Sequence, residues 1–237
     1  MDTGLLHGAA NLRAMERRLE AAAMNLANVE TPGYKRLRPA NESFEAALTR
    51  ASKLPARYPR TIVARDFAQG PLVTTENARE LSLRGEGFFV AEDGRGIKLA
   101  RHARFEVDPQ GYLVLHDGSR LLGQVGPILV PPGSSEMHVT SDGTVSAEGV
   151  VVGSLRVVKS DDAQRLVAEG GGAFRPPPAD RLPLSDAEVL QGVRERSNVE
   201  AVDEMLELMM IQHSFQASSR AMVARSEAAQ RYIQQSG

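Results

Sequence analysis

Leucines recur every seven residues near the start of the chain. They are Leu5, Leu12, Leu19 and Leu26. Met15, Ala22 and Val29 each follow a leucine by three places, and no proline occurs between Thr3 and Val29. This spacing places an apolar stripe along one side of a helix about 37 Å long. The stripe is narrow and partly made of small side chains, so we expect the helix to require partner helices.

This first helix is expected to end at a polar junction. Asn25-Leu26-Ala27-Asn28 is followed by Thr31-Pro32-Gly33-Tyr34-Lys35. Pro32 disfavours helix at the preceding threonine, and Gly33 favours a turn. Asn25 and Asn28 share a face where the last helical carbonyl groups lack partners. Taken alone, the pattern indicates a helix stop with two polar caps.

A second long helix is predicted from Ser197 to about Gln234. This segment contains no proline or glycine, and Ser197 and Glu200 have the spacing of a capping box. Apolar side chains again recur at seven, at Leu208, Phe215, Met222 and Ala229, with Val202, Met209 and Val223 on the adjacent strip. A helix of this length spans about 55 Å and is typical of coiled-coil packing. The methionines, Met205 and Met210 included, are interpreted as ordinary core filling.

Residues 78–175 have the pattern of a mostly antiparallel β domain. Short apolar runs are separated by Asp108-Pro109-Gln110-Gly111, by Asp117-Gly118 and by Asp142-Gly143. Such turn residues between apolar runs are strong hairpin signals. Gly85 and Gly87 lack the third glycine and the following helix of a dinucleotide-binding loop, so that reading is rejected.

Linkers are expected on both sides of this domain. Residues 37–77 read as an irregular or extended linker, with one or two helical turns between Asn41 and Ala51. Gly170-Gly171-Gly172 indicates a flexible exit from the β domain, and residues 176–196 are expected to form a linker that returns to the helices. Within that linker Val189 to Val193 favours a strand, with a helical turn near Ser185 and Glu188 as the alternative.

Composition excludes several classes of function. The chain has 237 residues, a formal net charge of −2, no cysteine and no tryptophan. The charge gives no reason to expect nucleic acid or an anionic membrane as a partner. The lack of cysteine excludes disulfides, zinc-thiolate sites and thiol nucleophiles. No apolar run reaches the roughly 18 residues of a membrane span, and no cleavable signal peptide is evident.

The junction resembles the N-terminal signature of bacterial flagellar basal-body rod and hook proteins. The run Leu81 to Val90 resembles the start of the inserted domain of the longer members. The C-terminal segment is similar to the family at Ser197-Asn198-Val199, Glu204-Met205, Leu208-Met209, Gln212, Phe215 and Ser219-Arg220. It departs from the family at His213, Phe215 and Ser218, which affects individual hydrogen bonds more than the helix.

The resemblance implies a structural subunit of the flagellar basal-body rod. The expected fold is α+β, in which residues 1–36 and 197–237 supply long helices that pair as a coiled-coil-like layer, with a mostly antiparallel β domain inserted between them in the sequence. Copies of the chain, together with other rod and hook proteins, would build a helical tube that transmits torque from motor to hook. The run Gly126 to Pro131 favours the proximal rod over the distal rod. The resemblance also implies a periplasmic location reached through the flagellar type III export apparatus without signal cleavage.

The residues expected to mediate assembly lie in the two terminal segments. They are Leu5, Leu12, Met15, Leu19, Asn25, Leu26, Asn28, Thr31, Pro32, Gly33, Tyr34, Ser197, Asn198, Val199, Val202, Met205, Leu208, Met209, Phe215 and Met222. No cofactor, metal ion, nucleic acid or direct membrane insertion is expected.

Three alternatives remain at this stage. A coiled-coil scaffold or adhesin with a β head would share the helices and the sheet, but it would not need the junction. A hook-type axial protein shares the terminal motifs, although this middle domain is short for one. For an enzyme, the five histidines lack metal-ligand spacing and no nucleophile elbow, P-loop or zinc-protease motif occurs. Asp161-Asp162 could be paired acids, but a solvated turn is the simpler interpretation.

Overall fold

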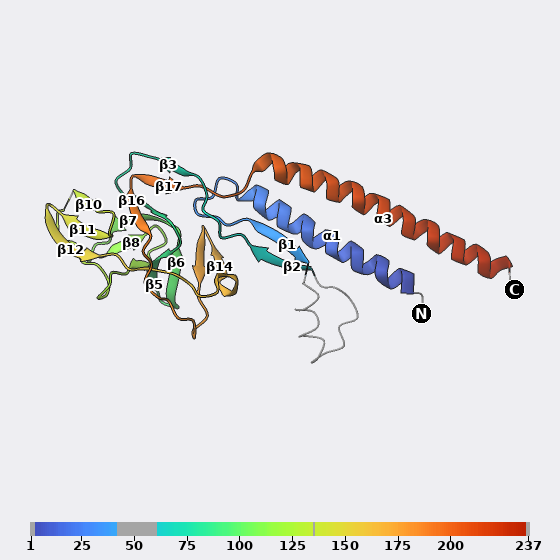
Figure 1. Ribbon diagram of the computed structural model, residues 1–237, viewed down its shortest axis with the longest axis horizontal. Coiled ribbons are helices and arrows are strands. Elements are labelled where there is room, and N and C mark those ends of the chain that lie inside the picture. Colours follow the sequence, from blue (N-terminus) through green and yellow to red (C-terminus); the bar gives the residue numbers. More distant parts are fainter. Residues whose placement is uncertain (1–2, 42–60, 135, 236–237) are drawn as a thin grey trace. The chain divides into compact units, whose positions relative to one another are not determined.

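The computed structural model describes residues 3–41, 61–134 and 136–235 (Figure 1). The chain divides into two compact units. The helical unit contains the described residues of 1–27, 37–66 and 200–237, and the β unit contains 28–36 and 67–199. The chain therefore passes four times from one unit to the other, and each unit is described separately below.

The helical unit consists of two helices and one strand pair. Helix α1 is Thr3–Ala27 and helix α3 is Ala201–Gln235. Strands β1 (Leu37–Asn41) and β2 (Thr61–Arg65) are antiparallel, with Leu37 opposite Arg65. Helix α1 packs against α3 and also contacts both strands.

The predicted α+β fold with a coiled-coil-like helix pair is wrong. The described chain is mostly β-sheet, with seventeen strands in several sheets and two α-helices. A coiled coil would bury the seven-residue stripes of both helices in one seam. Instead Val202, Met205 and Met209 of α3 are each at least half exposed, at 68%, 50% and 50%. The fully buried side chains described in the two helices include the small Ala21 and Ala22 together with Ile211.

The largest sheet of the β unit has ten strands. Their bounds are β4 (Glu80–Arg84), β5 (Phe88–Asp93), β6 (Gly96–Ala100), β7 (His102–Val107), β8 (Leu113–Leu115), β9 (Arg120–Leu121), β13 (Val157–Val158), β14 (Val167–Gly170), β15 (Ala173–Arg175) and β16 (Glu188–Gln191). The order across the sheet is β14-β15-β6-β5-β9-β8-β7-β4-β16, and β13 also pairs with β5. All of its named pairings are antiparallel, as the sequence predicted.

Two smaller sheets complete the β unit. Strands β10 (Met137–Val139), β11 (Thr144–Ala147) and β12 (Val150–Ser154) form an antiparallel meander. Strands β3 (Leu72–Thr74) and β17 (Val193–Glu195) form an antiparallel pair. A short 3₁₀ helix, η1 (Ala163–Arg165), lies between β13 and β14 in the chain.

Strand β5 contributes to two hydrophobic cores because alternate side chains point to opposite faces. Phe89 and Ala91 belong to the larger core, which also includes Val145 of β11. Phe88 and Val90 belong to the second core. There Phe88 packs edge-on against Phe174, with ring centroids 5.8 Å apart. Burial on both faces explains why this strand is a continuous apolar run.

The predicted hairpin turns are confirmed. Asp108-Pro109-Gln110-Gly111 connects β7 to β8, and the Asp108 carboxylate accepts the backbone N–H of Gln110 (2.9 Å) and of Tyr112 (2.8 Å). Asp117-Gly118 lies between β8 and β9, and Asp142-Gly143 between β10 and β11. At these turns Gly111, Gly118 and Gly143 have positive φ values of 90°, 82° and 85°. Glycine adopts this conformation with little strain.

The expected linkers contain more regular structure than the sequence indicated. The segment 37–77 contains β1, β2 and β3, while nearly all of the expected Asn41–Ala51 helical turns lie outside the described residues. Gly170-Gly171-Gly172 makes the turn from β14 to β15, and all three φ values are positive. Glu188–Gln191 is strand β16, which excludes the alternative helical turn at this point. Pairing with distant strands supplies the order that local composition did not predict.

Candidate functional site

The signature segment that follows α1 is a series of turns that docks in the β unit. Helix α1 ends at Ala27, four residues before Thr31. Thr31 donates its backbone N–H to the Asn28 carbonyl (3.1 Å) and its hydroxyl to the Asn28 side chain (3.0 Å). Gly33 has φ +67° and donates its backbone N–H to the Glu195 carbonyl (2.9 Å). The predicted helix stop is thus also a docking element.

A buried ionic cluster holds the end of this segment. Lys35 donates from Nζ to Glu195 Oε1 and to the Ala68 carbonyl, each at 2.7 Å. Arg101 binds the other carboxylate oxygen of Glu195, through Nε at 3.0 Å and Nη2 at 2.9 Å. The side chains of Lys35 and Glu195 are completely buried, and that of Arg101 is 4% exposed. Two cations therefore share one carboxylate away from water.

Backbone groups complete the bonding of the cluster. Arg101 Nη1 donates to the carbonyls of Gly85 (2.9 Å) and Gly87 (2.6 Å). Gly70 donates its backbone N–H to Glu195 Oε1 at 3.1 Å. Because a buried charge is costly unless it is paired and hydrogen-bonded, these contacts are needed for the cluster to exist.

Asn198 connects two other chain segments of the β unit, one at Arg36 and one at Ala68. Its Oδ1 accepts the Arg36 backbone N–H at 2.7 Å, and its Nδ2 donates to the Ala68 carbonyl at 3.1 Å.

The predicted capping box of the last helix is wrong, because α3 begins at Ala201, beyond Ser197 and Glu200. Ser197 Oγ instead accepts the backbone N–H of Val199 at 3.3 Å. Both Ser197 and Val199 are buried.

Asn25 has a corresponding role in the helical unit. Its amide forms a pair of hydrogen bonds with the backbone of Leu37, as donor at 2.9 Å and acceptor at 2.7 Å. Its Nδ2 also donates to Glu204 Oε2 on α3 at 3.1 Å. Asn25 and Glu204 are each only 1% exposed. One asparagine therefore fixes α1 to the first residue of β1 and to α3.

The other residues expected to mediate assembly fall into three groups by exposure. Tyr34 and Gly33 are buried. Those partly buried are Leu12, Met15, Leu19, Leu26, Asn28, Thr31, Pro32, Leu208 and Met222. The exposed ones are Val202, Met205, Met209 and Phe215. The side chain of Leu5 lies outside those that the structure describes.

Sequence reasoning missed Arg101 and Glu195. Arg101 lies between β6 and β7 and Glu195 is the last residue of β17, and neither is marked by a local motif in the sequence. The Lys35–Glu195 ion pair joins positions 160 residues apart in the sequence. Gly70 was also missed, although a Cβ there would lie 2.1 Å from the Arg196 carbonyl oxygen. Only the tertiary structure brings these residues together.

Next to the cluster lies His102, a largely buried histidine with a ring nitrogen that is unpaired among the described residues. This nitrogen, Nε2, lies 4.0 Å from Glu80 Oε2. Burial lowers the pKa of His102 to about 4, although the nearby carboxylates of Glu80 and Glu195 act in the opposite direction. Glu80 is engaged by Arg194 through both carboxylate oxygens. His102 is therefore neutral at pH 7.

We expect His102 to titrate near pH 4 in the folded chain, well below its usual 6.5. Between these values the unfolded chain binds more protons than the folded chain, so the free energy of unfolding falls as pH is lowered through this range. The measurement is the pH dependence of the His102 ring signals by NMR, together with urea unfolding of the chain and of His102→Gln. A His102 midpoint near 6.5 would contradict the burial of this ring.

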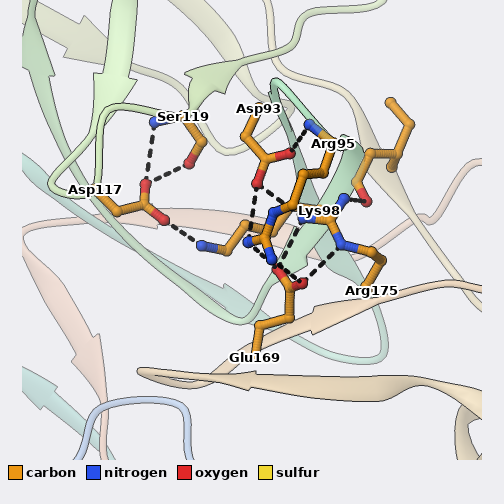
Figure 2. Close-up of polar contacts among 8 residues, drawn as sticks. Asp93, Arg95, Lys98, Asp117, Ser119, Glu169 and Arg175 are labelled. Carbon is orange, nitrogen blue, oxygen red and sulfur yellow. Dashed lines mark hydrogen bonds and ion pairs between the residues drawn. The ribbon is translucent and has the colours of Figure 1, made fainter.

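A second ionic network, centred on Arg175, lies at the surface of the β unit (Figure 2). Arg175 of β15 binds Glu169 of β14 through Nε at 2.8 Å, and Asp93 of β5 through Nη2 at 2.8 Å. The Arg95 backbone N–H and the Arg175 guanidinium, in that order, hold the pKa of Asp93 below its usual value. The network ties the β5–β6 turn to the β14–β15 hairpin.

The Asp117 turn stands beside this network in Figure 2. Burial acts to raise the pKa of Asp117, but hydrogen bonds from Lys98 and Ser119 outweigh it and lower the pKa to about 2. These contacts connect β6 to the β8–β9 turn. Nothing in their geometry requires a ligand, since each carboxylate is already bound by a neighbouring donor.

The described residues contain no group of three or more side chains able to hold a metal ion. A cavity of about 530 Å³ borders Arg101, Gly85 and Gly87 and is also lined by Asp161. The neighbouring Asp162 accepts the Gln164 backbone N–H at 3.1 Å and caps η1, which is an ordinary turn role. Neither described helix is long and apolar enough to span a membrane.

Comparison with known proteins finds similarity along the whole chain. Residues 82–147 match the family model described as flagellar hook protein FlgE/F/G D1 domain. Residues 190–235 match the model of the flagellar basal body rod FlgEFG protein C-terminal region. The chain is 31% identical to the flagellar basal-body rod protein FlgF of Caulobacter vibrioides, over 100% of this chain and 99% of the relative. It belongs to the flagellar basal-body rod protein family.

Further relatives extend the comparison. Identity is 30% to FlgF of Rhizobium meliloti, with 91% of this chain and 90% of that protein covered. It is 26% to the basal-body rod protein FlgG of Agrobacterium fabrum, with 93% and 94% covered. The second family match includes both Glu195 and Asn198 as well as α3. The chain is a structural subunit of the flagellar basal-body rod, with the FlgF type favoured over the FlgG type.

Proposed function

We propose that this rod subunit assembles through the uncovered apolar face of α3. The observation that carries the proposal is the exposure of Val202, Leu206 and Met209, which are spaced four and three residues apart and so share one face of the helix. Glu204 and Ile211, on a different face, are buried within the helical unit. A polymer of identical or related subunits gives the exposed face a partner in each neighbour.

The expected partners are copies of the chain and other rod and hook proteins. A head-to-tail contact that does not close builds a helical tube, and such a tube can transmit torque along its axis. Higher identity to the relatives named FlgF supports a position in the proximal rod. The role is mechanical and involves no reaction, cofactor or nucleic acid.

The proposed route to the periplasmic rod is the flagellar type III export apparatus, without removal of a signal peptide. The N-terminal segment then has two tasks, first in export and later in assembly. Mass spectrometry of the protein recovered from purified basal bodies tests this point. A mature protein that lacks the residues of α1 would contradict it.

Met209→Asp is expected to reduce incorporation into basal bodies at least about tenfold, which corresponds to a contact weaker by about 1.4 kcal/mol. A carboxylate at a buried apolar contact has no partner, whereas the isolated chain already exposes half of this side chain. Ser214→Asp, at an exposed position on another face of α3, is the matched control for helix propensity. Equal incorporation of the two variants, quantified by immunoblotting of basal bodies, would argue against this assembly face.

The test of the function itself is purification of intact basal bodies. We expect the protein in the rod fraction, and we expect deletion of its gene to abolish flagellar assembly. Recovery of the protein at the cell surface without flagellar components would instead favour the scaffold or adhesin.

A further inference from the structure

We propose that the Lys35–Glu195–Arg101 cluster is a clamp that gathers every chain segment through which the β unit is joined to the helices. The inference rests on the proposed function as a torque-transmitting subunit. The chain leaves or enters the β unit at four points, after residues 27, 36, 66 and 199. The residues next to these points belong to three segments of the β unit, 28–36, 67–71 and 195–199.

Each of the three segments is bound to the other two within the β unit. Segment 28–36 reaches Glu195 through Gly33 and Lys35. Segment 67–71 contributes the Ala68 carbonyl, which accepts both Lys35 Nζ and Asn198 Nδ2. The third segment adds the Arg196 backbone N–H, which donates to the Pro71 carbonyl at 2.9 Å. The Glu195 carboxylate therefore lies where the three segments cross.

Arg101 anchors this crossing to the body of the β unit. It lies between β6 and β7 in the chain and binds Glu195 and the Gly85 and Gly87 carbonyls together. A close backbone approach adds a steric constraint, because a Cβ on Gly172 would lie 2.3 Å from the Pro32 carbonyl oxygen. Force that arrives along any one segment is thus shared by all three and passed to the sheet.

This arrangement differs from one that merely stabilises the β unit. The three charged residues of the cluster are not members of the two hydrophobic cores, although the Arg101 guanidinium lies 5.9 Å from the Phe88 ring centroid and Phe67 packs against the second core. Loss of Lys35, which leaves the Arg101–Glu195 pair in place, should therefore loosen the crossing segments while the strands remain folded. It should also leave the assembly face of α3 unchanged, so that a damaged subunit still enters the rod.

The test compares Lys35→Met with Lys98→Met. The first variant keeps the Arg101–Glu195 pair, so the remaining buried charges, one cation and one carboxylate, balance each other. The second removes the Lys98–Asp117 ion pair elsewhere in the β unit, whose side chains are 11% and 46% exposed. Hydrogen exchange of the full chain is followed at Gly33, Arg36, Gly70 and Arg196, with amides of β5 and β7 as internal references. Swimming in normal and viscous medium is then measured in cells that carry each variant.

We expect exchange of the four crossing amides to accelerate at least tenfold in Lys35→Met only, with β5 and β7 unchanged. Lys35→Met cells should retain the subunit in basal bodies and lose swimming speed selectively in viscous medium. Unchanged exchange of the crossing amides in Lys35→Met, or equal acceleration of all amides, would overturn the proposal of a clamp. Wild-type swimming speed of Lys35→Met cells in viscous medium would also overturn it, as would failure of Lys35→Met to enter basal bodies. Absence of the wild-type protein from basal bodies would instead refute the proposed function, whatever the exchange results.

Discussion

Glu195→Gln is expected to lower the free energy of unfolding of the β unit by about 3–5 kcal/mol, which is typical of breaking a buried ion pair from one side. The amide has the size of the carboxylate but no charge, so Lys35 and Arg101 are left as two buried cations. Neither has access to water, because their side chains are 0% and 4% exposed. Urea unfolding of the full chain at pH 7, followed by circular dichroism, measures the change.

The control is Glu188→Gln, which removes the pair between Arg84 and Glu188 across strands β4 and β16. These side chains are 61% and 43% exposed, so the expected loss is below about 1 kcal/mol. In the double variant Lys35→Met and Glu195→Gln, the total loss should be smaller than the sum of the single losses, because one uncompensated cation is removed. Similar effects of Glu195→Gln and Glu188→Gln would show that the cluster is not desolvated.

Gly70→Ala is expected to destabilise the β unit by about 3 kcal/mol, at the upper end of the usual cost of overpacking. The added Cβ would lie 2.1 Å from the Arg196 carbonyl oxygen and 3.3 Å from the Asn198 nitrogen. Both are backbone atoms of the segment that carries Glu195, so they cannot turn away as a side chain would. The backbone must separate, which also strains the hydrogen bond from Gly70 to Glu195 Oε1.

Gly94→Ala provides the matched control in the turn between β5 and β6. A Cβ at Gly94 meets nothing within 4 Å, and Gly94 is not among the residues with positive φ. We expect its unfolding free energy to change by no more than about 0.5 kcal/mol. Thermal and urea unfolding of both variants give the comparison. A Gly70→Ala variant as stable as Gly94→Ala would mean that the two segments do not approach as described.

Much of the β unit could be predicted because its signals are local. Asp108 to Gly111 and Asp142-Gly143 combine a side-chain acceptor with a glycine at positive φ, and a hairpin turn needs little else. Local signals did not decide between strand β16 and a helical turn. They also did not predict the hairpin at Gly170 to Gly172. Both depend on pairing with strands far away in the sequence, such as β4 for β16.

The predicted fold class was wrong for a related reason. Seven-residue spacing in both terminal segments predicts apolar stripes, but it does not say which stripe a second helix covers. Ala21 and Ala22 of α1 are buried, whereas Val202 and Met209 of α3 remain at the surface. The N-terminal signature that ends at Lys35 indicated the family but not the buried ion pair that Lys35 forms. Its partner, Glu195, lies 160 residues further along the chain.

The sequence alone determined the two helices, most of the hairpins and the family, because helix periodicity, turn chemistry and signature motifs are properties of neighbouring residues. The tertiary structure decided that Glu195 lies between Lys35 and Arg101, that Gly70 must lack a side chain, and that one face of α3 is left for a partner. The physical reason is that burial and charge pairing depend on which distant segments meet, and no local pattern records that meeting.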